Sequence, residues 1–239
     1  MPLLRGGRSL SIGARAVSGH RPADRAGLSA LPLEVAPRLL GALLTTDVAG
    51  ERVTVRITEV EAYHGKGTGP VPDPASHARS GRTARSATMW GEPGRLYVYL
   101  SHGIHSCVNV VAAPAGTAGG ILLRGGQIVE GVDAARRRRS ARAAPPADRD
   151  LARGPGRFGD ALGLRHPLHD GLDAISGEEQ AGARARLLLP PAPPERVAHG
   201  PRVGVAGPGG SEEYPWRFWI PDDPTVSTYR PSASRRSRA

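Results

Sequence analysis

The segment from residue 56 to residue 109 constrains the fold more than any other part of the chain. A predicted strand leads into this segment. In residues 53–57 aliphatic side chains alternate with polar ones, which is typical of a half-buried strand, and this strand ends near Glu61. Residues 96–100 and 106–111 are two further strand-like runs. The short connection between these runs contains glycine, which predicts a β-hairpin.

Periodicity elsewhere predicts helices and strands in no repeating order. Aliphatic residues between positions 35 and 44 recur at helical spacing, and Pro37 suits the first turn of a helix, where a missing N–H costs nothing. Further helices are expected at 130–142 and 158–164, and further strands at 120–124, 127–129, 182–190, 201–205 and 216–220. Because this order lacks βαβ regularity, we predict an α+β fold: a single domain with a curved, mainly antiparallel β-sheet, flanking helices and a protruding β-hairpin.

Composition divides the chain into three parts. Residues 1–30 are rich in Arg and Gly without periodicity, which predicts a disordered extension. Residues 31–228 are expected to form the single folded domain, since 239 residues with 39% hydrophobic side chains suffice for one core. Residues 229–239 are rich in Ser and Arg and are expected to form a disordered tail.

The charge of the chain favours a polyanionic partner. The formal net charge is +10 at pH 7, which suits nucleic acid. Lys66 is the only lysine among 32 Lys and Arg residues, and the chain also holds 32 Gly and 23 Pro. This usage is typical of a GC-rich genome, so part of the basicity reflects coding bias. Charge alone therefore favours a nucleic-acid partner over other partners only modestly.

Several kinds of site are disfavoured by the sequence. Cys107 is the only cysteine, so no disulfide can form within the chain, and its apolar surroundings predict a packed core thiol. His77, His102 and His105 have no partners at zinc-ligand spacing, so we expect neither a metal nor a cofactor. No apolar run approaches the length of a membrane span or of a secretion signal, so we expect no membrane partner.

Glu61 is the first candidate for chemistry. A carboxylate at a strand end that faces a cavity can act as a general base toward water. From spacing alone, an ion pair with Arg56 or with a loop arginine is the favoured alternative. Glu59 lies on the same strand face and is either a competing acid or a structural support for Glu61.

Aromatic and cationic side chains surround that acid in the sequence. Tyr63, Tyr97 and Tyr99 could stack on a base, although each tyrosine alone is more typical of a core. His77 could bind phosphate, a base or a metal, although a hydrogen-bonded loop histidine is the commoner case. Taken together, acid, aromatic faces and cations suit a pocket for a flat, electron-poor ring on a polyanion, as a damaged base in DNA would be.

The segment between the first strand and the hairpin carries most of the candidate phosphate contacts. Residues 64–88 are rich in Gly, Pro, Ser and Arg, and a loop of this length in a compact domain is usually functional or disordered. Arg79, Arg82 and Arg85 lie in it and could contact phosphates. For the four arginines at 136–139, a solvated helix face is slightly favoured over phosphate contacts.

An ordered series of motifs is far more specific than any of its parts. It comprises Glu61-Ala62-Tyr63, Ala75-Ser76-His77, Thr83-Ala84-Arg85, Met89-Trp90, Pro93-Gly94-Arg95-Leu96-Tyr97-Val98-Tyr99, Asn109 and Leu122-Leu123-Arg124. The series resembles the alkyladenine (3-methyladenine) DNA glycosylase family, whose monofunctional members excise purines. The resemblance covers roughly residues 31–226 and includes Arg202-Val203-Gly204-Val205 and Trp216-Arg217-Phe218.

The resemblance implies a catalytic residue and a base pocket. Glu61 falls on the base that activates water for attack on C1′ of the deoxyribose. The residues that fall on the pocket are Tyr63, His77, Tyr99, Asn109 and Arg124. Among these, Asn109 corresponds to the residue that crowds the exocyclic amine of guanine, and Arg124 to a pocket or backbone-binding arginine.

The resemblance also implies a DNA-binding set. His102 falls on the hairpin tip that fills the gap left by a flipped nucleotide, and Arg79, Arg82 and Arg85 complete the set. Family members usually carry tyrosine at that tip and asparagine where Ser86 stands. These departures leave the reaction as expected but leave the substrate range and the efficiency of flipping open.

The implied function is that of a DNA repair glycosylase. It would flip alkylated or deaminated purines (3-methyladenine, 7-methylguanine, hypoxanthine type) out of duplex DNA and excise them hydrolytically, leaving an abasic site. Because Lys66 is the only lysine, a Schiff-base route with strand cleavage is disfavoured. We expect a monomer in the bacterial cytoplasm, associated with the nucleoid.

Two other classes of protein fit part of this sequence. The alternative is a non-catalytic nucleic-acid-binding relative, which explains the charge and the aromatic residues but not the ordered acid, tyrosines and histidine. An RNA-binding domain is less favoured, because the sequence has no RNP motif.

Overall fold

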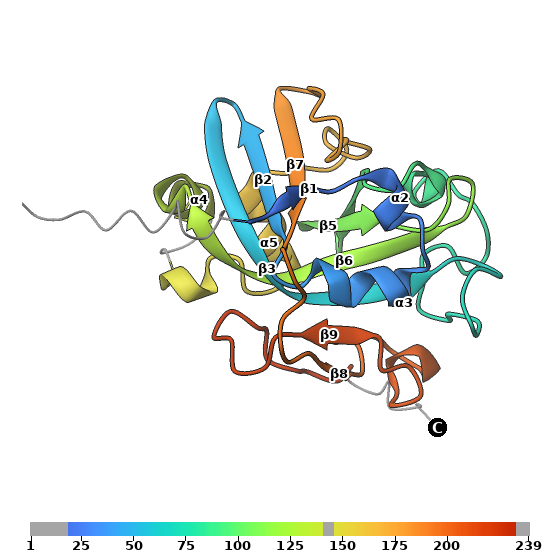
Figure 1. Ribbon diagram of the computed structural model, residues 1–239. Coiled ribbons are helices and arrows are strands. Elements are labelled where there is room, and N and C mark those ends of the chain that lie inside the picture. Colours follow the sequence, from blue (N-terminus) through green and yellow to red (C-terminus); the bar gives the residue numbers. More distant parts are fainter. Residues whose placement is uncertain (1–18, 141–145, 233–239) are drawn as a thin grey trace, which may run out of the picture.

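A computed structural model describes residues 19–140 and 146–232 of the protein (Figure 1). The strands are β1 (Arg21–Pro22), β2 (Leu43–Val48), β3 (Glu51–His64), β4 (Leu96–Ser101), β5 (His105–Val111), β6 (Gly119–Glu130), β7 (Ala183–Leu189), β8 (Ala198–Gly200) and β9 (Arg217–Trp219). The α-helices are α2 (Arg25–Leu28), α3 (Pro32–Val35), α4 (Val132–Ser140) and α5 (Pro155–Leu162). Short 3₁₀ helices are η1 (Ala36–Leu39), η2 (Ala87–Trp90), η3 (Asp148–Asp150) and η4 (Pro208–Gly210).

All the strands of the described part belong to one sheet, and all of their pairings are antiparallel. The main path runs β1-β7-β2-β3-β6-β5-β4, and β9 pairs with β3 and β8 beside this path. The long strands β3 and β6 carry bulges, which bend a strand and increase its twist. The expected α+β class with a mainly antiparallel sheet is therefore confirmed.

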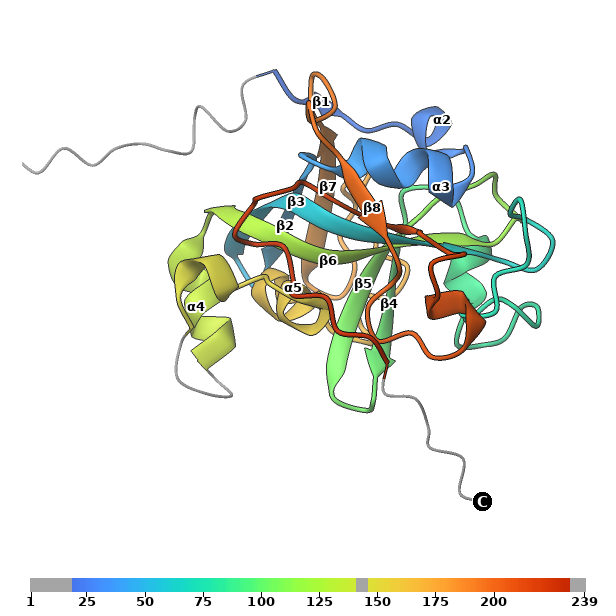
Figure 2. The ribbon, with the colours of Figure 1, turned by 90° about the horizontal axis from the view of Figure 1, so that it is seen from below.

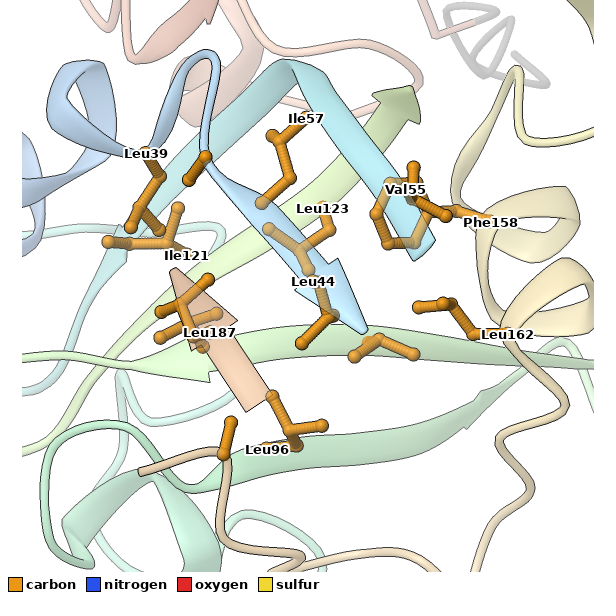
Figure 3. Close-up of a cluster of buried hydrophobic side chains, with 14 of the residues drawn as sticks. Leu39, Leu44, Val55, Ile57, Leu96, Ile121, Leu123, Phe158, Leu162 and Leu187 are labelled. Atoms are coloured by element: carbon orange, nitrogen blue, oxygen red, sulfur yellow. The ribbon is translucent and has the colours of Figure 1, made fainter. Parts of the chain in front are cut away.

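The apolar core lies on one side of the central strands (Figure 3). Leu44 of β2, Ile57 of β3 and Leu123 of β6 point into it, and Phe158 and Leu162 of α5 close one end of the same cluster. On the other side, β8, β9 and the C-terminal segment lie over β3 and β6 (Figures 1 and 2). As a result β3 is buried on both faces for most of its length, and the expectation of a half-buried strand is wrong.

A change in alternation along β3 decides which face carries the acids. Val55 and Ile57 enter the core, but the next core residues are Val60 and Ala62, one position out of step. The strand register shifts on either side of Glu59, which marks an irregular pairing with β6. A β-bulge of this kind re-aims the side chains that follow it, so the acidic residues after Ile57 face away from the core.

The ordered domain begins earlier than the sequence indicated. β1 pairs with β7, and Leu28 of α2 is buried in the core, so residues 19–30 belong to the fold and not to a disordered extension. Residues 1–18 lie outside the described residues. At the other end, the Arg230 carbonyl accepts a hydrogen bond from the Gly204 backbone N–H, and Arg217 lies 5.9 Å from the Tyr229 ring centroid, so Tyr229 and Arg230 contact the domain. Residues 233–239 lie outside the described residues.

Other elements differ from expectation in their bounds. The helix expected through residue 44 ends with η1, and Leu43 and Leu44 begin strand β2. Every residue of such a run is apolar when it is buried on all sides, so hydrophobic periodicity cannot distinguish a helix from a strand there. The strands expected at 120–124 and 127–129 are one strand, β6. Residues 201–205 hold no strand, and the nearest is β8 just before them.

The β4–β5 pair forms the expected hairpin. Its pairing runs from Leu96 opposite Val110 to Ser101 opposite His105. His102 and Gly103 in the turn both have positive φ, 49° and 70°. Figure 2 shows this turn at the lower margin of the ribbon, away from the core.

Candidate active site

A cavity of about 540 Å³ opens on the face of the sheet opposite the apolar core. Its walls come from the end of β3, the β4–β5 hairpin, β6, the loop after β3 and the segment after β8. Eight residues expected at a site line it: Glu61, Tyr63, His77, Arg79, Tyr99, His102, Asn109 and Arg124. Arg82 and Arg85 lie outside the lining. Segments far apart in sequence thus place an acid, aromatic rings and arginines around one cavity.

Glu61 is the acid of this cavity, and its carboxylate is fully buried. It accepts hydrogen bonds from the Tyr63 hydroxyl at 2.8 Å and from the Val203 backbone N–H at 2.7 Å. The Nε atom of Arg124 lies 3.3 Å from its Oε1 atom. Donors on three sides fix the carboxylate in one orientation while it still faces the cavity.

Glu59 supports this arrangement and is not free to act as an acid. Its carboxylate accepts from Arg124 Nε at 3.1 Å and from Arg217 Nε at 2.7 Å, and from the backbone and hydroxyl of Ser227 at 2.7 and 2.9 Å. Glu59 does not line the cavity. Of the two roles considered for Glu59, the contacts favour support of the Glu61 site.

The bulge of β6 places Arg124 between the two acids. Val60 pairs with Leu123 and Glu59 with Gly125, so Arg124 has no residue directly opposite and reaches both carboxylates. A Cβ at position 125 would lie 2.8 Å from a backbone oxygen and 3.1 Å from Glu59, so glycine permits this close approach. Burial works to lower the pKa of Arg124, but the two carboxylates outweigh it and keep the guanidinium charged.

Aromatic rings form one wall of the cavity. Tyr97 and Tyr99 are stacked with their centroids 5.4 Å apart, and His77 meets Tyr99 edge-on at 4.6 Å. His77 Nδ1 lies 3.1 Å from the Tyr97 hydroxyl. Burial, followed by the charges of Arg85 and Arg79, lowers the pKa of His77, so its ring is neutral near pH 7. This wall therefore offers aromatic faces and a neutral ring edge to a ligand.

The tyrosines of the cavity keep their protons. Burial raises the pKa of Tyr97 to about 12, and burial and then Glu61 raise the pKa of Tyr63 well above its ordinary value. The Tyr63 hydroxyl consequently acts as a donor to Glu61 across the neutral pH range. Cys107 also lines the cavity and is buried, and burial raises the pKa of its thiol, which agrees with the packed thiol expected from the sequence.

Asn109 lies in β5, opposite Tyr97 on one side and Leu122 on the other. Its side-chain amide is buried and donates from Nδ2 to the Tyr97 carbonyl at 3.0 Å. The side chain is thus held in one orientation at the cavity wall, where a fixed group can exclude a ligand atom sterically.

The rim of the cavity carries exposed cationic or polar side chains. His102 is exposed at the hairpin turn, and its Nδ1 atom lies 3.1 Å from the Ser101 hydroxyl. Arg79 lines the cavity, and Arg85 lies 5.6 Å from the centroid of the Tyr99 ring. Arg82 is exposed farther along the same loop.

The arginine run of α4 is engaged within the protein. Arg136 pairs with Asp133 and Asp148, and Arg137 with Glu51. Arg138 donates to backbone carbonyls and Arg139 pairs with Asp160. Arg138 and Arg139 are largely buried in these contacts, which neither expected role describes. Arg136 and Arg137 remain 42% and 63% exposed, as on the solvated helix face that the sequence favours.

Arg202 and Val203 belong to the series of family motifs, but the sequence alone indicates no role for them. Arg202 is fully buried and forms a bidentate pair with Asp73, at 2.9 and 2.7 Å. This pair ties the loop after β3 to the segment after β8, from which Val203 reaches Glu61. Asp73 lies four residues before His77 in a loop with little periodicity, so no sequence pattern points to its partner.

The described part of the chain offers no metal site and no membrane-spanning helix. Within residues 19–140 and 146–232, no group of three or more His, Cys, Asp or Glu side chains is placed to hold a metal ion. Over the same residues, no helix has the length and apolar character that a membrane span requires.

Comparison with known proteins decides the family. The family model described as methylpurine-DNA glycosylase matches residues 27–224. The chain belongs to this family. It is therefore a monofunctional DNA glycosylase, an enzyme of base excision repair, and the resemblance stated from the sequence is confirmed.

Bacterial relatives are similar over nearly their whole length. Their names describe them as candidate 3-methyladenine DNA glycosylases. One from Leifsonia xyli is 52% identical over 83% of this chain and 88% of its own length. One from Nocardia farcinica is 50% identical over 84% of this chain and 88% of its own length. One from Streptomyces avermitilis is 47% identical over 86% of this chain and 91% of its own length.

Proposed function

We propose that this methylpurine-DNA glycosylase flips an alkylated or deaminated purine out of duplex DNA and hydrolyses its glycosidic bond. The substrates are of the 3-methyladenine, 7-methylguanine and hypoxanthine type, and the products are the free base and an abasic site. The observation that carries the proposal is the buried Glu61 carboxylate, fixed by Tyr63, Val203 and Arg124 at the wall of an aromatic cavity.

Glu61 is the residue that activates water. A buried carboxylate with fixed orientation can take a proton from water as the oxygen attacks C1′. Arg124 is shared between Glu59 and Glu61, so it holds the carboxylate without neutralising it completely. Alkylation at a ring nitrogen makes the purine a better leaving group, so the protein must add mainly positioning and an activated water.

The cavity walls hold the flipped base. Tyr63, Tyr99 and His77 provide faces and edges for a purine ring, and stacking on aromatic rings contributes about 1–3 kcal/mol per base. Asn109, held by the Tyr97 carbonyl, crowds the position of the guanine amino group. Normal guanine is therefore disfavoured, while hypoxanthine and adenine derivatives lack the clashing group. 7-Methylguanine carries the same amino group, and its weakened glycosidic bond offsets this crowding.

The rim contacts the DNA around the lesion. His102 at the exposed hairpin turn is the wedge that occupies the space of the flipped nucleotide. Arg79, Arg82 and Arg85 contact phosphates beside it. The protein acts as a monomer in the bacterial cytoplasm, in association with the nucleoid, and it needs no metal or cofactor.

The reaction is hydrolytic and not of the Schiff-base kind. Lys66, the only lysine, is exposed in the loop after β3 and does not line the cavity. No lysine amine is therefore in reach of C1′, and strand cleavage through a covalent imine is not expected.

Excision from defined duplexes tests the proposal. Purified protein is incubated with duplex DNA that carries one hypoxanthine or one 7-methylguanine, and alkali-labile sites are measured with Glu61→Gln as the control. Lesion-dependent, alkali-labile sites that the control does not produce support the proposal. Tight binding to lesion DNA without any excision would instead support the alternative, a non-catalytic relative.

A further inference from the structure

The guanidinium of Arg202 lies between two aromatic rings behind the base cavity. Its central carbon is 4.5 Å from the centroid of Tyr63 and 5.0 Å from that of Trp216. Arg202 is the bulkiest of the fully buried side chains in the described part of the protein. A cation at these distances interacts strongly with the negative face of each ring, because Arg202 is buried away from solvent.

Hydrogen bonds to three residues fix the position of the Arg202 guanidinium. Arg202 donates to both carboxylate oxygens of Asp73, to the Ala62 carbonyl at 3.1 Å, and to the Gly209 carbonyl at 2.8 and 3.2 Å. Asp73 is itself fixed, because it accepts from the backbone N–H of His64 at 3.0 Å. A buried ion pair of this kind adds little net stability compared with apolar residues of the same volume, so its charge calls for another explanation.

The Tyr63 ring separates this cation from the bound base. Tyr63 lines the cavity, whereas Arg202 and Trp216 do not. The Tyr63 ring therefore has a guanidinium over it and also belongs to the cavity wall that a ligand would contact. A ring polarised by a cation on one face attracts a second cation less on the other, while its stacking on a neutral ring is retained.

We propose that Arg202, with Asp73 as its counter-ion, is a positioning residue that makes the Tyr63 wall favour neutral purines over cationic ones. The inference rests on the proposed function and assigns a substrate preference to the same cavity. Hypoxanthine is neutral, whereas 7-methylguanine carries a formal positive charge from its N7 methyl group. Arg85, which lies 5.6 Å from the Tyr99 centroid, acts in the same direction but more weakly, because it is exposed to solvent.

Two variants with opposite expected effects test this role. Single-turnover excision of hypoxanthine and of 7-methylguanine is measured in matched duplexes, and the ratio of the two rates is compared with that of the wild type. Asp73→Asn removes the counter-charge and strengthens the field of Arg202, so the ratio should rise in favour of hypoxanthine by about threefold. The double variant Asp73→Asn/Arg202→Met removes both charges, so the ratio should fall by about threefold or more.

A conservative variant separates charge from shape. Arg202→Lys keeps the cation but loses the two-pronged contact with Asp73, so both rates should fall while their ratio stays near that of the wild type. Circular dichroism checks the fold of each variant. Each folded Asp73 variant shows by itself whether the ratio of the hypoxanthine rate to the 7-methylguanine rate rises or falls. If one of the Asp73 variants does not fold, the other still decides.

The possible outcomes are distinct. Equal losses on both substrates in every variant would mean that the pair is only a scaffold, and would overturn the inference. A ratio that moves in the same direction in the single and double Asp73 variants would overturn it as well. If the wild-type protein released neither base, the proposed function itself would fail, and the charge preference with it.

Discussion

The hydroxyl of Tyr63 donates a hydrogen bond of 2.8 Å to Glu61, two residues earlier on the same strand. The aromatic wall and the general base are thus built into one stretch of backbone. This contact exists because the two side chains follow the irregular pairing of β3 and face the cavity together. The proposed chemistry depends on it, since a carboxylate that rotates freely is a less effective base.

We predict that Glu61→Gln abolishes most excision but leaves lesion binding intact. The amide oxygen of glutamine can still accept from Val203, and its NH₂ group can donate to the Tyr63 hydroxyl, so the geometry is largely kept. The loss of the general base should slow single-turnover excision by about 10²–10⁴-fold. Binding to a duplex with an abasic-site analogue serves as the control, and near-normal excision by the variant would remove Glu61 from the catalytic role.

A second prediction concerns Asn109. Replacement by Ser removes the amide that crowds the guanine amino group, so release of guanine should increase relative to hypoxanthine. A single contact of this kind discriminates by about 1–3 kcal/mol, which corresponds to roughly 5- to 150-fold. The rates are measured on matched duplexes, with Leu122→Val as a control that enlarges the same wall from the neighbouring strand. A guanine-to-hypoxanthine ratio equal in both variants would mean that Asn109 only packs.

Much of this site could be foreseen from the sequence because its residues occur in an ordered series. The spacing of Glu61 and Tyr63 fixed their common face, and the hairpin pattern located His102 at a turn. The alternation itself carried a signal that was missed. Core residues at the odd positions 53, 55 and 57 are followed by core residues at the even positions 60 and 62. This switch marks the β-bulge near Glu59 that turns the acids toward the cavity.

Other features depend on contacts that no local pattern encodes. Arg202 and Asp73 are 129 positions apart, and only the folded chain brings them together. The arginine run of α4 has the composition of a DNA-binding surface, yet its partners Glu51, Asp148 and Asp160 lie elsewhere in the chain. Residues 19–30 were expected to be disordered because β1 is only a short edge strand and has no period of its own.

A third prediction concerns stability at acidic pH. Burial lowers the pKa of His64 to about 4 from an ordinary value of 6.5, and neither ring nitrogen has a hydrogen-bond partner among the residues that the structure describes. As pH falls, the unfolded chain binds the proton first, so stability is full above about pH 6.5 and is lost between about 6.5 and 4. The loss from this one group should reach about 3 kcal/mol.

Urea unfolding at several pH values measures this effect. The apolar ring of a His64→Phe variant cannot take up a proton, so its stability should decrease less than that of the wild type as pH falls from 6.5 to 4. Comparison of the two proteins cancels the contributions of other titrating groups. If the two stability curves run parallel across this range, the buried histidine is not responsible for any acid sensitivity.

The last prediction concerns His102 at the hairpin turn. Its backbone has a φ of 49°, in the left-handed region, and its side chain is exposed at the turn beside Gly103. An imidazole ring has less stacking area than a phenol ring, so it should hold open the gap in the duplex less firmly than tyrosine. We expect His102→Tyr to increase the flipped fraction severalfold, and His102→Ala to reduce it by about tenfold, in keeping with base-stacking energies of about 1–3 kcal/mol. Fluorescence of a base analogue placed beside the lesion reports the flipped fraction, with DNA affinity measured in parallel. Identical flipping in all three proteins would show that the histidine stays outside the helix, and the departure from tyrosine would then have no effect on catalysis.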